Sequence, residues 1–408
     1  MQYHIQAPQQ PVIGTIELPT SKSISNRALI LSALEEGKDS SINNLALCDD
    51  THAMRRAFTT SSHLIDIGAA GTAMRFLTAY FAITPGSWQI TGSERMKERP
   101  VGILVDALNS LGAHIRYLEK NGYPPLSIKG KSLKGGYIRL NGTISSQFIS
   151  AILMIAPTMQ DGLTIQLEGD IISKPYIKMT LQMMKLFGVT AKWRGDTITI
   201  PPQQYQGATL TVEADWSAAS YWYSMVALLP NSKIKLPGLM RRSMQGDSKV
   251  AKIFESLGVA TRYHQVMEII HTGVRVPFLD YDFKEQPDLA QTVVVACCLL
   301  NVPFHFTGLQ SLKIKETNRI AALIAECGKL GYLLNEPQHG ELAWDGTKAC
   351  KPAGQVTIDT YDDHRMAMAF APAAFQHDII INHPEVVSKS YPKFWDDLRK
   401  FTAVCRND

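Results

Sequence analysis

Residues 145–188 read SSQFISAILMIAPTMQDGLTIQLEGDIISKPYIKMTLQMMKLFG. The stretch begins with three polar residues, continues as a strongly apolar run, breaks briefly, and returns as an alternating segment. A second run then ends at Gly188, and its i, i+3, i+4 apolar spacing is typical of a helix with one buried face. Gly188 fits the position directly after such a helix. The order predicts a buried helix, a strand and an amphipathic helix.

The same order recurs in five other segments, which begin at Ser21, Ala69, Asp215, Pro287 and Asp362. Alternating segments follow the amphipathic helices, so each unit is predicted to be a βαβαββ repeat. Repeats of this length favour a quasi-symmetric architecture over one doubly wound sheet. At roughly 100–200 residues per domain, 408 residues suit two domains of three repeats each. We expect an N-terminal domain of residues 14–213 and a C-terminal domain of residues 1–13 and 214–408.

Composition excludes several classes of protein. Hydrophobic residues make up 45% of the chain and charged ones 19%, as in globular proteins, and the net charge of +4 is too small for a nucleic-acid coat. No apolar run reaches the ~18 residues that span a bilayer, and the N-terminus lacks a signal-peptide pattern. The six cysteines show no C-x-x-C pair or metal spacing, which predicts reduced thiols in a cytoplasmic protein.

The first polar signature points to an anionic ligand. Lys22 and Arg27 open its helix, although a cation at a helix N-terminus is disfavoured by roughly 0.3–1 kcal/mol. Backbone N–H groups at that end favour anions, and all six signatures occupy the same place in the repeat. Taken alone, this signature also fits ordinary capping by Ser21 or Ser23.

The other signatures also have two interpretations each. Gly71 lies in a turn that lets backbone approach a ligand, or in a plain turn. Asp288 heads an apolar helix either as its cap or as a general base. Arg365, next to His364, begins the sixth buried helix, where a structural role is the alternative.

Two charged loops between strand and helix strengthen the functional interpretation. They supply Arg99 in the first and Glu316 and Arg319 in the second. A solvated surface is the alternative, but arginine suits bidentate contacts with carboxylate or phosphate. Together the signatures and loops predict an interdomain cleft with two cationic faces and two carboxylates, suited to two small polyanionic substrates. Kinase, dehydrogenase and metalloprotease motifs are not found.

Eight motifs resemble, in order and along nearly the whole chain, those of the 5-enolpyruvylshikimate-3-phosphate synthase family. They are PTSKSISNRALIL, AGTAMRFL, ERMKERPVGILVDAL, SSQF, GDIISKPYI, SMQGD, KIKETNR and DDHRMAMAF. The resemblance implies the enolpyruvyl transferase fold, a two-domain inside-out α/β barrel of six βαβαββ repeats. It also implies transfer of the enolpyruvyl group of phosphoenolpyruvate to the 5-hydroxyl of shikimate 3-phosphate, through a tetrahedral intermediate, in the shikimate pathway. No metal or other cofactor is implied, and we expect a monomer with no nucleic-acid or membrane partner.

By the same resemblance, the residues expected to bind shikimate 3-phosphate are Lys22, Ser23, Arg27, Ser145, Ser146, Gln147, Ser173, Tyr176, Asp288, Ser311 and Lys315. Those expected to bind phosphoenolpyruvate are Lys22, Gly71, Arg99, Gln147, Arg319, Arg365 and Lys389. Three of the positions are expected to be catalytic. Asp288 resembles the base for the 5-hydroxyl, Glu316 resembles the group that exchanges a proton with the enolpyruvyl methylene, and Lys22 is the third.

The chain departs from the family pattern at several places. Ala69 stands where an asparagine is expected, and Ser311 where an asparagine is frequent. Only TTSSHL separates the end of the first repeat from the second, so the first repeat is expected to lack its strand pair. Lys389 lies a few residues from where some members carry a lysine.

Three other functions compete with this hypothesis. The related UDP-N-acetylglucosamine enolpyruvyl transferase shares the fold, but it carries a cysteine in the loop that matches GSERMKERP, where this chain has none. The departures at Ala69 and in the first repeat also allow a ligand-binding pseudoenzyme. A nucleic-acid binder is disfavoured by the near-neutral charge. Because both domains carry cations, we expect substrate binding to favour domain closure.

Overall fold

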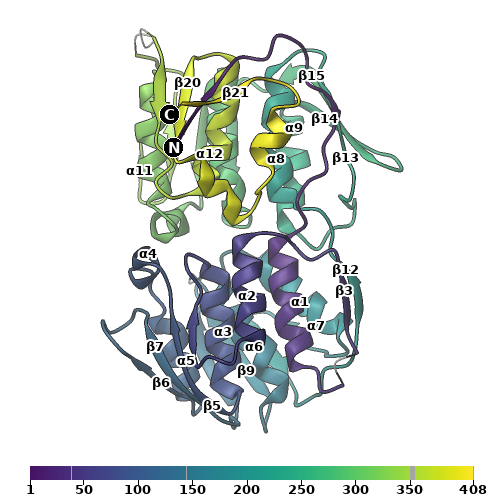
Figure 1. Cartoon of the computed structure of the whole chain (residues 1–408), viewed down its shortest axis with the longest axis vertical. Coiled ribbons are helices and arrows are strands. Elements are labelled where there is room, and N and C mark those ends of the chain that lie inside the picture. Colours follow the sequence, from purple (N-terminus) through teal and green to yellow (C-terminus); the bar gives the residue numbers. More distant parts are fainter. Residues whose placement is uncertain (38, 144, 350–353, 408) are drawn as a thin grey trace. The chain divides into compact units, whose positions relative to one another are not determined.

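The computed structural model describes residues 1–37, 39–143, 145–349 and 354–407 (Figure 1). The chain forms two compact units, one of Met1–Pro19 with Glu213–Asp408 and the other of Thr20–Val212. We call the first the discontinuous unit, because it is built from two separate parts of the chain, and the second the continuous unit. No helix in the described residues is long and apolar enough to cross a membrane.

Three helices form the centre of the continuous unit. They are α1 (Lys22–Leu34), α3 (Gly71–Ile83) and α6 (Ser146–Ile155), and each contacts the other two. Most positions of α3 and α6 are apolar and buried, as expected of central helices, whereas the first two turns of α1 are largely polar and its apolar residues follow. The remaining helices of this unit are α2 (Asp49–Thr59), α4 (Glu94–Lys97), α5 (Gly102–Ser110), the 3-10 helix η1 (Ala156–Thr158) and α7 (Lys174–Leu186).

Three described sheets accompany these helices. Their strand orders are β12-β3, β4-β5-β7-β6 and β10-β11-β9-β8. The strands are β3 (Ser41–Asn43), β4 (Leu64–Asp66), β5 (Gly86–Thr91), β6 (His114–Tyr117), β7 (Leu126–Gly130), β8 (Gly136–Asn141), β9 (Leu163–Glu168), β10 (Lys192–Arg194), β11 (Thr197–Ile200) and β12 (Thr209–Thr211). The second and third sheets, with their helices, follow the chain order βαβαββ, whereas the first has two strands.

The discontinuous unit repeats this plan. Its buried helices are α8 (Trp216–Leu228), α10 (Ala290–Leu300) and α12 (His364–Phe370), and α10 contacts both of the others. The shorter or more exposed helices are η2 (Gly246–Lys249), α9 (Val250–Glu255), η3 (Pro287–Leu289), η4 (Gln310–Ile314), α11 (Arg319–Lys329), η5 (Ala371–Phe375), η6 (Pro384–Lys389) and α13 (Phe394–Leu398).

Its described sheets have the orders β14-β15-β13-β2, β16-β17-β18 and β19-β20-β1-β21. The strands are β1 (Gln2–Ile5), β2 (Ile13–Thr15), β13 (Lys233–Leu236), β14 (Leu257–Tyr263), β15 (Met267–Arg275), β16 (Leu279–Asp282), β17 (Phe304–Thr307), β18 (Leu342–Trp344), β19 (Val356–Ile358), β20 (Ile379–Asn382) and β21 (Val404–Asn407).

Strand exchange between the first and fourth repeats sets the limits of the units. Strand β2 precedes α1 but pairs in parallel with β13, which follows α8; β12 precedes α8 but pairs in parallel with β3, which follows α1. Ile16 and Leu18 pack in the core of the discontinuous unit, and the Ile16 N–H donates to the Lys235 carbonyl. Residues 14–19 and Glu213, which the sequence assigned to the N-terminal domain, therefore lie in the discontinuous unit.

The described cysteines are free thiols. Cys48, Cys297, Cys298 and Cys327 are buried, and Cys405 is exposed. Cys350 lies outside the described residues.

Candidate functional site

The first polar signature places Lys22 beside a carboxylate of its own unit. Ser21 caps α1 and accepts a hydrogen bond from the Ile24 N–H at 3.5 Å, so the capping interpretation of this serine is correct. Lys22 Nζ lies 3.1 Å from Oδ2 of Asp50, which is buried on α2. The lysine side chain is only 15% exposed. Asp50 thus holds the charge of Lys22 near the start of α1.

Arg27 lies in a buried cage of neutral oxygens. Its Nε donates to Thr180 Oγ1 at 2.7 Å, and its two terminal nitrogens donate to the Ser23 carbonyl at 2.9 Å and to Ser150 Oγ at 3.2 Å. A fourth, longer bond of 3.4 Å reaches the Tyr176 carbonyl. Burial lowers the pKa of Arg27 to about 10, partly offset by Tyr176. Because a buried cation with neutral partners favours an added anion, the cage supports an anionic ligand.

The second signature brings Gly71 against Arg99. A Cβ atom at Gly71, the first residue of α3, would lie 2.5 Å from Arg99 Nη1, so only glycine permits this approach. Arg75, one turn further along α3, donates to the carbonyls of Gly71 at 3.2 Å and Pro100 at 3.1 Å. Arg75 therefore ties the loop that carries Arg99 to the start of α3. Ala69 is exposed.

The third signature joins α6 to α3. Ser145 caps α6 and accepts a hydrogen bond from the Gln147 N–H at 3.4 Å. The Gln147 side chain donates to Thr72 Oγ1 at 3.3 Å. Ser146 is buried at the first position of α6. These contacts place the polar starts of α3 and α6 together, as the repeat predicts.

Ser173 starts α7 in a strained conformation. Its φ of 55° lies in the left-handed region, which residues other than glycine seldom occupy and which is enriched at binding sites. The Ser173 carbonyl accepts the Tyr176 N–H at 3.0 Å. Ser173 and Tyr176 thereby reach the same helix start, and the carbonyl of Tyr176 is one of the partners of Arg27.

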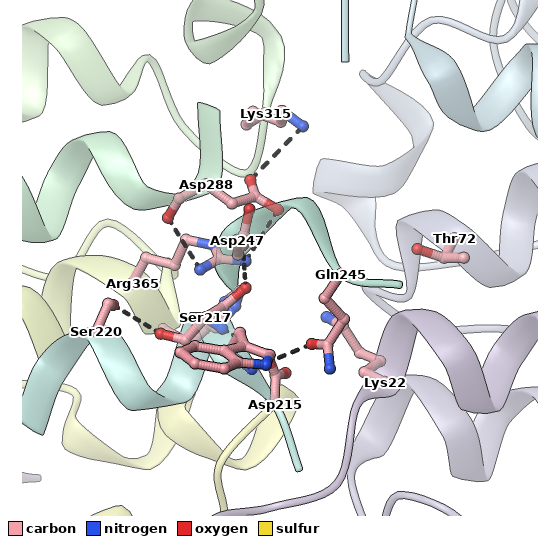
Figure 2. Close-up of polar contacts among 12 residues, drawn as sticks. Lys22, Thr72, Asp215, Ser217, Ser220, Gln245, Asp247, Asp288, Lys315 and Arg365 are labelled. Carbon is pink, nitrogen blue, oxygen red and sulfur yellow. Dashed lines mark hydrogen bonds and ion pairs between the residues drawn. The ribbon is translucent and has the colours of Figure 1, made fainter. Parts of the chain in front are cut away.

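In the discontinuous unit, Asp288 lies among three cations, two of which, Lys315 and Arg365, are drawn in Figure 2. Its carboxylate is 3.0 Å from Arg365 Nη2, 3.4 Å from Arg319 Nη1 and 4.0 Å from Lys315 Nζ. Its carbonyl also accepts from Arg365 Nη1 at 3.1 Å. Burial opposes ionisation of Asp288, but the charges of Arg365, Lys315 and Arg319 outweigh it and hold the pKa of this carboxyl well below its usual range. Asp288 is therefore an anion in this arrangement.

Glu316 continues the same cluster. Its carboxylate lies 2.9 Å from Arg319 Nη2 and 2.8 Å from Lys389 Nζ. Lys389, at the end of η6, is itself buried. The structure thus brings Lys389 into this cluster, although it lies a few residues from where some family members carry a lysine.

Asp363 is a member of the cluster that the sequence analysis missed. Its carboxylate caps α12 by accepting the Arg365 N–H at 2.9 Å, and it binds Arg319 Nε at 2.6 Å. Burial opposes the charge of Arg319, but Asp363, Glu316 and Asp288 outweigh it and raise the pKa of this arginine. The only signal in the sequence was the acidic pair before His364. Asp50, Thr72, Ser150 and Thr180 were missed in the same way, because they act on other site residues.

Six predicted residues of the discontinuous unit thus form one connected cluster, which contains Asp288, Lys315, Glu316, Arg319, Arg365 and Lys389. Ser311 lies half-buried in η4. No group of His, Cys, Asp and Glu in the described part of the chain is arranged to hold a metal ion. The arrangement can bind anions through four cations and can exchange protons through two carboxyls.

A family model and the sequences of known proteins point to the same family. The family model of EPSP synthase (3-phosphoshikimate 1-carboxyvinyltransferase) matches residues 6–60 and 55–398. A 3-phosphoshikimate 1-carboxyvinyltransferase of Bacteroides fragilis is 56% identical over 403 residues, which cover 98% of each chain. One from Aliivibrio salmonicida is 37% identical, with 97% of this chain and 98% of the relative covered.

Solved structures agree at the level of the fold. EPSP synthase from Acinetobacter baumannii superposes with a TM-score of 0.78 at 20% identity, covering 99% of this chain and all of the other. The enolpyruvyl transferase NikO from Streptomyces tendae gives a TM-score of 0.73 at 14% identity, covering 100% and 99%. The match to the family model over nearly the whole chain and the two close relatives lead to one conclusion: the chain belongs to the EPSP synthase (3-phosphoshikimate 1-carboxyvinyltransferase) family.

Proposed function

We propose that this protein transfers the carboxyvinyl group of phosphoenolpyruvate to the 5-hydroxyl of shikimate 3-phosphate and releases phosphate, a step of the shikimate pathway. The observation that carries this proposal is the cluster of Asp288 and Glu316 among Arg319, Arg365 and Lys389, in a chain of this family. Carboxyls for proton transfer and cations for phosphate and carboxylate are the groups that the reaction needs.

Shikimate 3-phosphate is assigned mainly to the continuous unit. The caged charge of Arg27, with the neutral partners described above, suits the ring phosphate. The helix starts at Ser145 and Ser173 offer backbone N–H groups and hydroxyls to the same anion. The full proposed set is Lys22, Ser23, Arg27, Ser145, Ser146, Gln147, Ser173, Tyr176, Asp288, Ser311 and Lys315.

Phosphoenolpyruvate is assigned to cations of both units. Arg99 against Gly71 supplies a guanidinium at the start of α3, and Arg319 and Arg365 supply two more beside the carboxylates. The full proposed set is Lys22, Gly71, Arg99, Gln147, Arg319, Arg365 and Lys389. Both sets of residues then act on one pair of substrates.

The reaction proceeds by addition and elimination. The 5-hydroxyl oxygen attacks C2 of phosphoenolpyruvate as Asp288 takes the hydroxyl proton, and C3 gains a proton from Glu316 or Lys22. The tetrahedral intermediate then loses a proton from C3 to the same group and breaks its C2–O bond to phosphate. Positioned acid–base groups contribute roughly 10²–10⁴-fold to such steps, and fixed cations stabilise the developing charge without reorganisation.

Substrate binding makes Asp288 a better base. Without substrate its charge is compensated by Arg365, Arg319 and Lys315. When the phosphate and carboxylate of phosphoenolpyruvate engage these cations, less of their field acts on Asp288, and its pKa rises toward the ordinary value. The substrate anions and the Asp288 carboxylate therefore share the same cations.

The finer architecture belongs to the same proposal. We propose an inside-out α/β barrel of six repeats, the first of them shortened. The two-stranded sheet β12-β3 supports the shortening, as does the division of the family match into segments that meet at residues 55–60. The alignment with the Aliivibrio salmonicida relative spans 429 positions, more than the 408 residues of this chain, so this chain lacks segments that the relative has. We further propose a cytoplasmic monomer, on the basis of composition alone.

A phosphate-release assay tests the proposed reaction. The protein with both substrates should release inorganic phosphate and form the 5-O-carboxyvinyl product, identified by its vinyl protons in NMR. Phosphoenolpyruvate with UDP-N-acetylglucosamine in place of shikimate 3-phosphate should release none. Absence of phosphate release at every substrate concentration would favour a ligand-binding pseudoenzyme, and release only with the UDP-sugar would favour the related transferase.

A further inference from the structure

Two motifs play no part in the proposed reaction, namely the polar start of the fourth repeat and the SMQGD motif. They meet at the N-terminus of α8 (Figure 2). Gln245 of the motif accepts the Trp216 N–H at 3.1 Å and donates to the Ala214 carbonyl at 2.8 Å. The Ser217 hydroxyl donates to Asp247 Oδ2. The motif therefore fixes the position of Asp247 relative to α8.

Asp247 is a buried carboxyl with one bonded oxygen. The residue is 3% exposed, and its Oδ1 has no hydrogen-bond partner among the described residues. A buried carboxylate oxygen without a donor favours the protonated form. Burial, followed by the charge of Asp288, raises the pKa of Asp247 to about 7.

The charged groups that act on Asp247 come from several elements. Asp288 before α10 and Asp215 at the cap of α8 disfavour its ionised form, whereas Arg365 on α12 and the Ser217 hydroxyl favour it. Tyr281 on β16 also interacts electrostatically with Asp247. Burial, followed by the charges of Glu285, Asp282 and Asp247, raises the pKa of this tyrosine to about 12. Tyr281 is therefore neutral near pH 7. Asp288 and Arg365, which Figure 2 shows next to Asp247, are its charged neighbours that belong to the proposed site.

Coulombic repulsion between two carboxylates is mutual. The repulsion that disfavours a charge on Asp247 also makes Asp288 hold a proton more readily. This effect matters because Arg365, Lys315 and Arg319 all lower the pKa of Asp288 and so weaken it as a base. A negative charge on Asp247 opposes those three cations.

We propose that Asp247 is a positioning residue of the reaction, held by Ser217 beside Asp288 and Arg365, and that its negative charge makes Asp288 a stronger acceptor of the substrate proton. The inference rests on the proposed function. It predicts that kcat rises with pH as Asp247 loses its proton near pH 7.

The test is the pH profile of kcat in Asp247→Asn, whose amide keeps the shape and the acceptor for Ser217. We expect kcat above pH 7 to fall ~10-fold, the KM values for both substrates to stay within ~2-fold, and the rise near pH 7 to disappear. Ser217→Ala removes a bond that favours the charged form, so it should keep the plateau but shift the rise to higher pH. Glu213→Gln is the matched control, because Glu213 is a buried carboxyl that accepts a hydrogen bond from Ser243, the first residue of the same motif. It should leave the rise in place.

Stability provides a readout that does not depend on turnover. The pKa of Asp247 is raised in the folded state, so between pH 4 and 7 the folded chain keeps a proton that the unfolded chain loses. The contribution of this group to the free energy of unfolding thus falls as pH rises through that window. Asp247→Asn should remove this fall and be at least as stable as the wild type at pH 8 in urea titrations. A structural role alone predicts lower stability at every pH.

The outcomes separate this inference from the proposed function. If the wild type transfers the carboxyvinyl group and Asp247→Asn keeps the wild-type pH profile, the inference is wrong and the proposed function stands. A variant with kcat lowered equally at all pH values overturns the inference as well. A wild-type protein without transferase activity overturns the proposed function and the inference together.

Discussion

At the scale of single residues, the cluster around Asp288 and Glu316 couples acid–base groups to cations. Each carboxylate contacts Arg319, and each has a second cation of its own, Arg365 or Lys389. The cations around Asp288 hold this carboxylate ionised, and they are also groups that bind substrate anions in the proposed reaction. Replacing each carboxyl by an amide of the same shape should therefore lower the rate of proton transfer much more than the affinity for the substrates.

We expect Asp288→Asn and Glu316→Gln to lower kcat by ~100-fold or more, with dissociation constants for shikimate 3-phosphate changed only a few-fold. Each substitution removes a proton-transfer group and leaves the cations in place. Stopped-time phosphate assays and titration calorimetry measure the two quantities. Asp396→Asn, at an exposed carboxylate paired with Arg399, is the control and should match the wild type. Full turnover in Asp288→Asn would remove this residue from the role of base.

Gly71 provides a second prediction at this scale. In Gly71→Ala the new Cβ would meet Arg99 Nη1 at 2.5 Å, so the guanidinium must move. Because a hydrogen bond to a charged group contributes ~1.5–3 kcal/mol, KM for phosphoenolpyruvate should rise on the order of tenfold or more. Gly328→Ala is the matched control, since its Cβ meets nothing within 4 Å. Equal KM values in both variants would show that Arg99 does not bind phosphoenolpyruvate.

At the scale of elements, Arg27 joins three helices. It lies on α1 and bonds to Ser150 on α6 and Thr180 on α7, so the guanidinium that is proposed to bind phosphate also fixes the packing of these helices. The hydroxyl of Thr180 also contacts the Tyr176 carbonyl one turn earlier and Ser150 Oγ on α6, each at 2.9 Å. Its contact with Arg27 links α7 to α1.

Thr180→Val should therefore weaken both stability and binding. Loss of a buried bond to a charged donor lowers the free energy of unfolding by about 1–3 kcal/mol, and the misplaced guanidinium should raise the dissociation constant for shikimate 3-phosphate several-fold. Thr78→Val is the matched control, because Thr78 is equally buried and bonds only within α3, to the Met74 carbonyl and sulfur. Urea denaturation and calorimetry compare the two. If both variants bind alike, Thr180 does not orient Arg27.

The helix starts could be predicted from the sequence, whereas their partners could not. Polar signatures before apolar runs indicated where Lys22, Ser145 and Asp288 begin their helices, because capping and periodicity are local properties. The exchange of β2 and β12 between the two units was not predicted, since alternation identifies a strand but not its neighbour. Asp363 and Thr180 were missed for the same reason, because each is defined by contact with an arginine distant in the sequence.

At the scale of the whole molecule, the proposed phosphoenolpyruvate ligands belong to two units with separate chain segments. Arg99 lies in the continuous unit and Arg365 in the discontinuous unit. If both bind one substrate molecule, each should contribute to its affinity.

We expect Arg99→Gln and Arg365→Gln each to raise KM for phosphoenolpyruvate by ~10-fold or more. The dissociation constant for shikimate 3-phosphate should change little in either variant. Lys252→Gln, at an exposed lysine paired with Glu255, is the control. An Arg365→Gln variant with wild-type KM would contradict the claim that both units act on one phosphoenolpyruvate.

The central claim is that the carboxyvinyl group moves to the substrate hydroxyl by cleavage of the C2–O bond. Phosphoenolpyruvate labelled with ¹⁸O at its bridging oxygen tests this directly, when the protein is incubated with shikimate 3-phosphate and the released phosphate is analysed by mass spectrometry. Addition and elimination predict that all of the bridging label leaves with phosphate, in amounts equal to the carboxyvinyl product. Label retained in the three-carbon product would mean that the P–O bond breaks instead, and would contradict carboxyvinyl transfer.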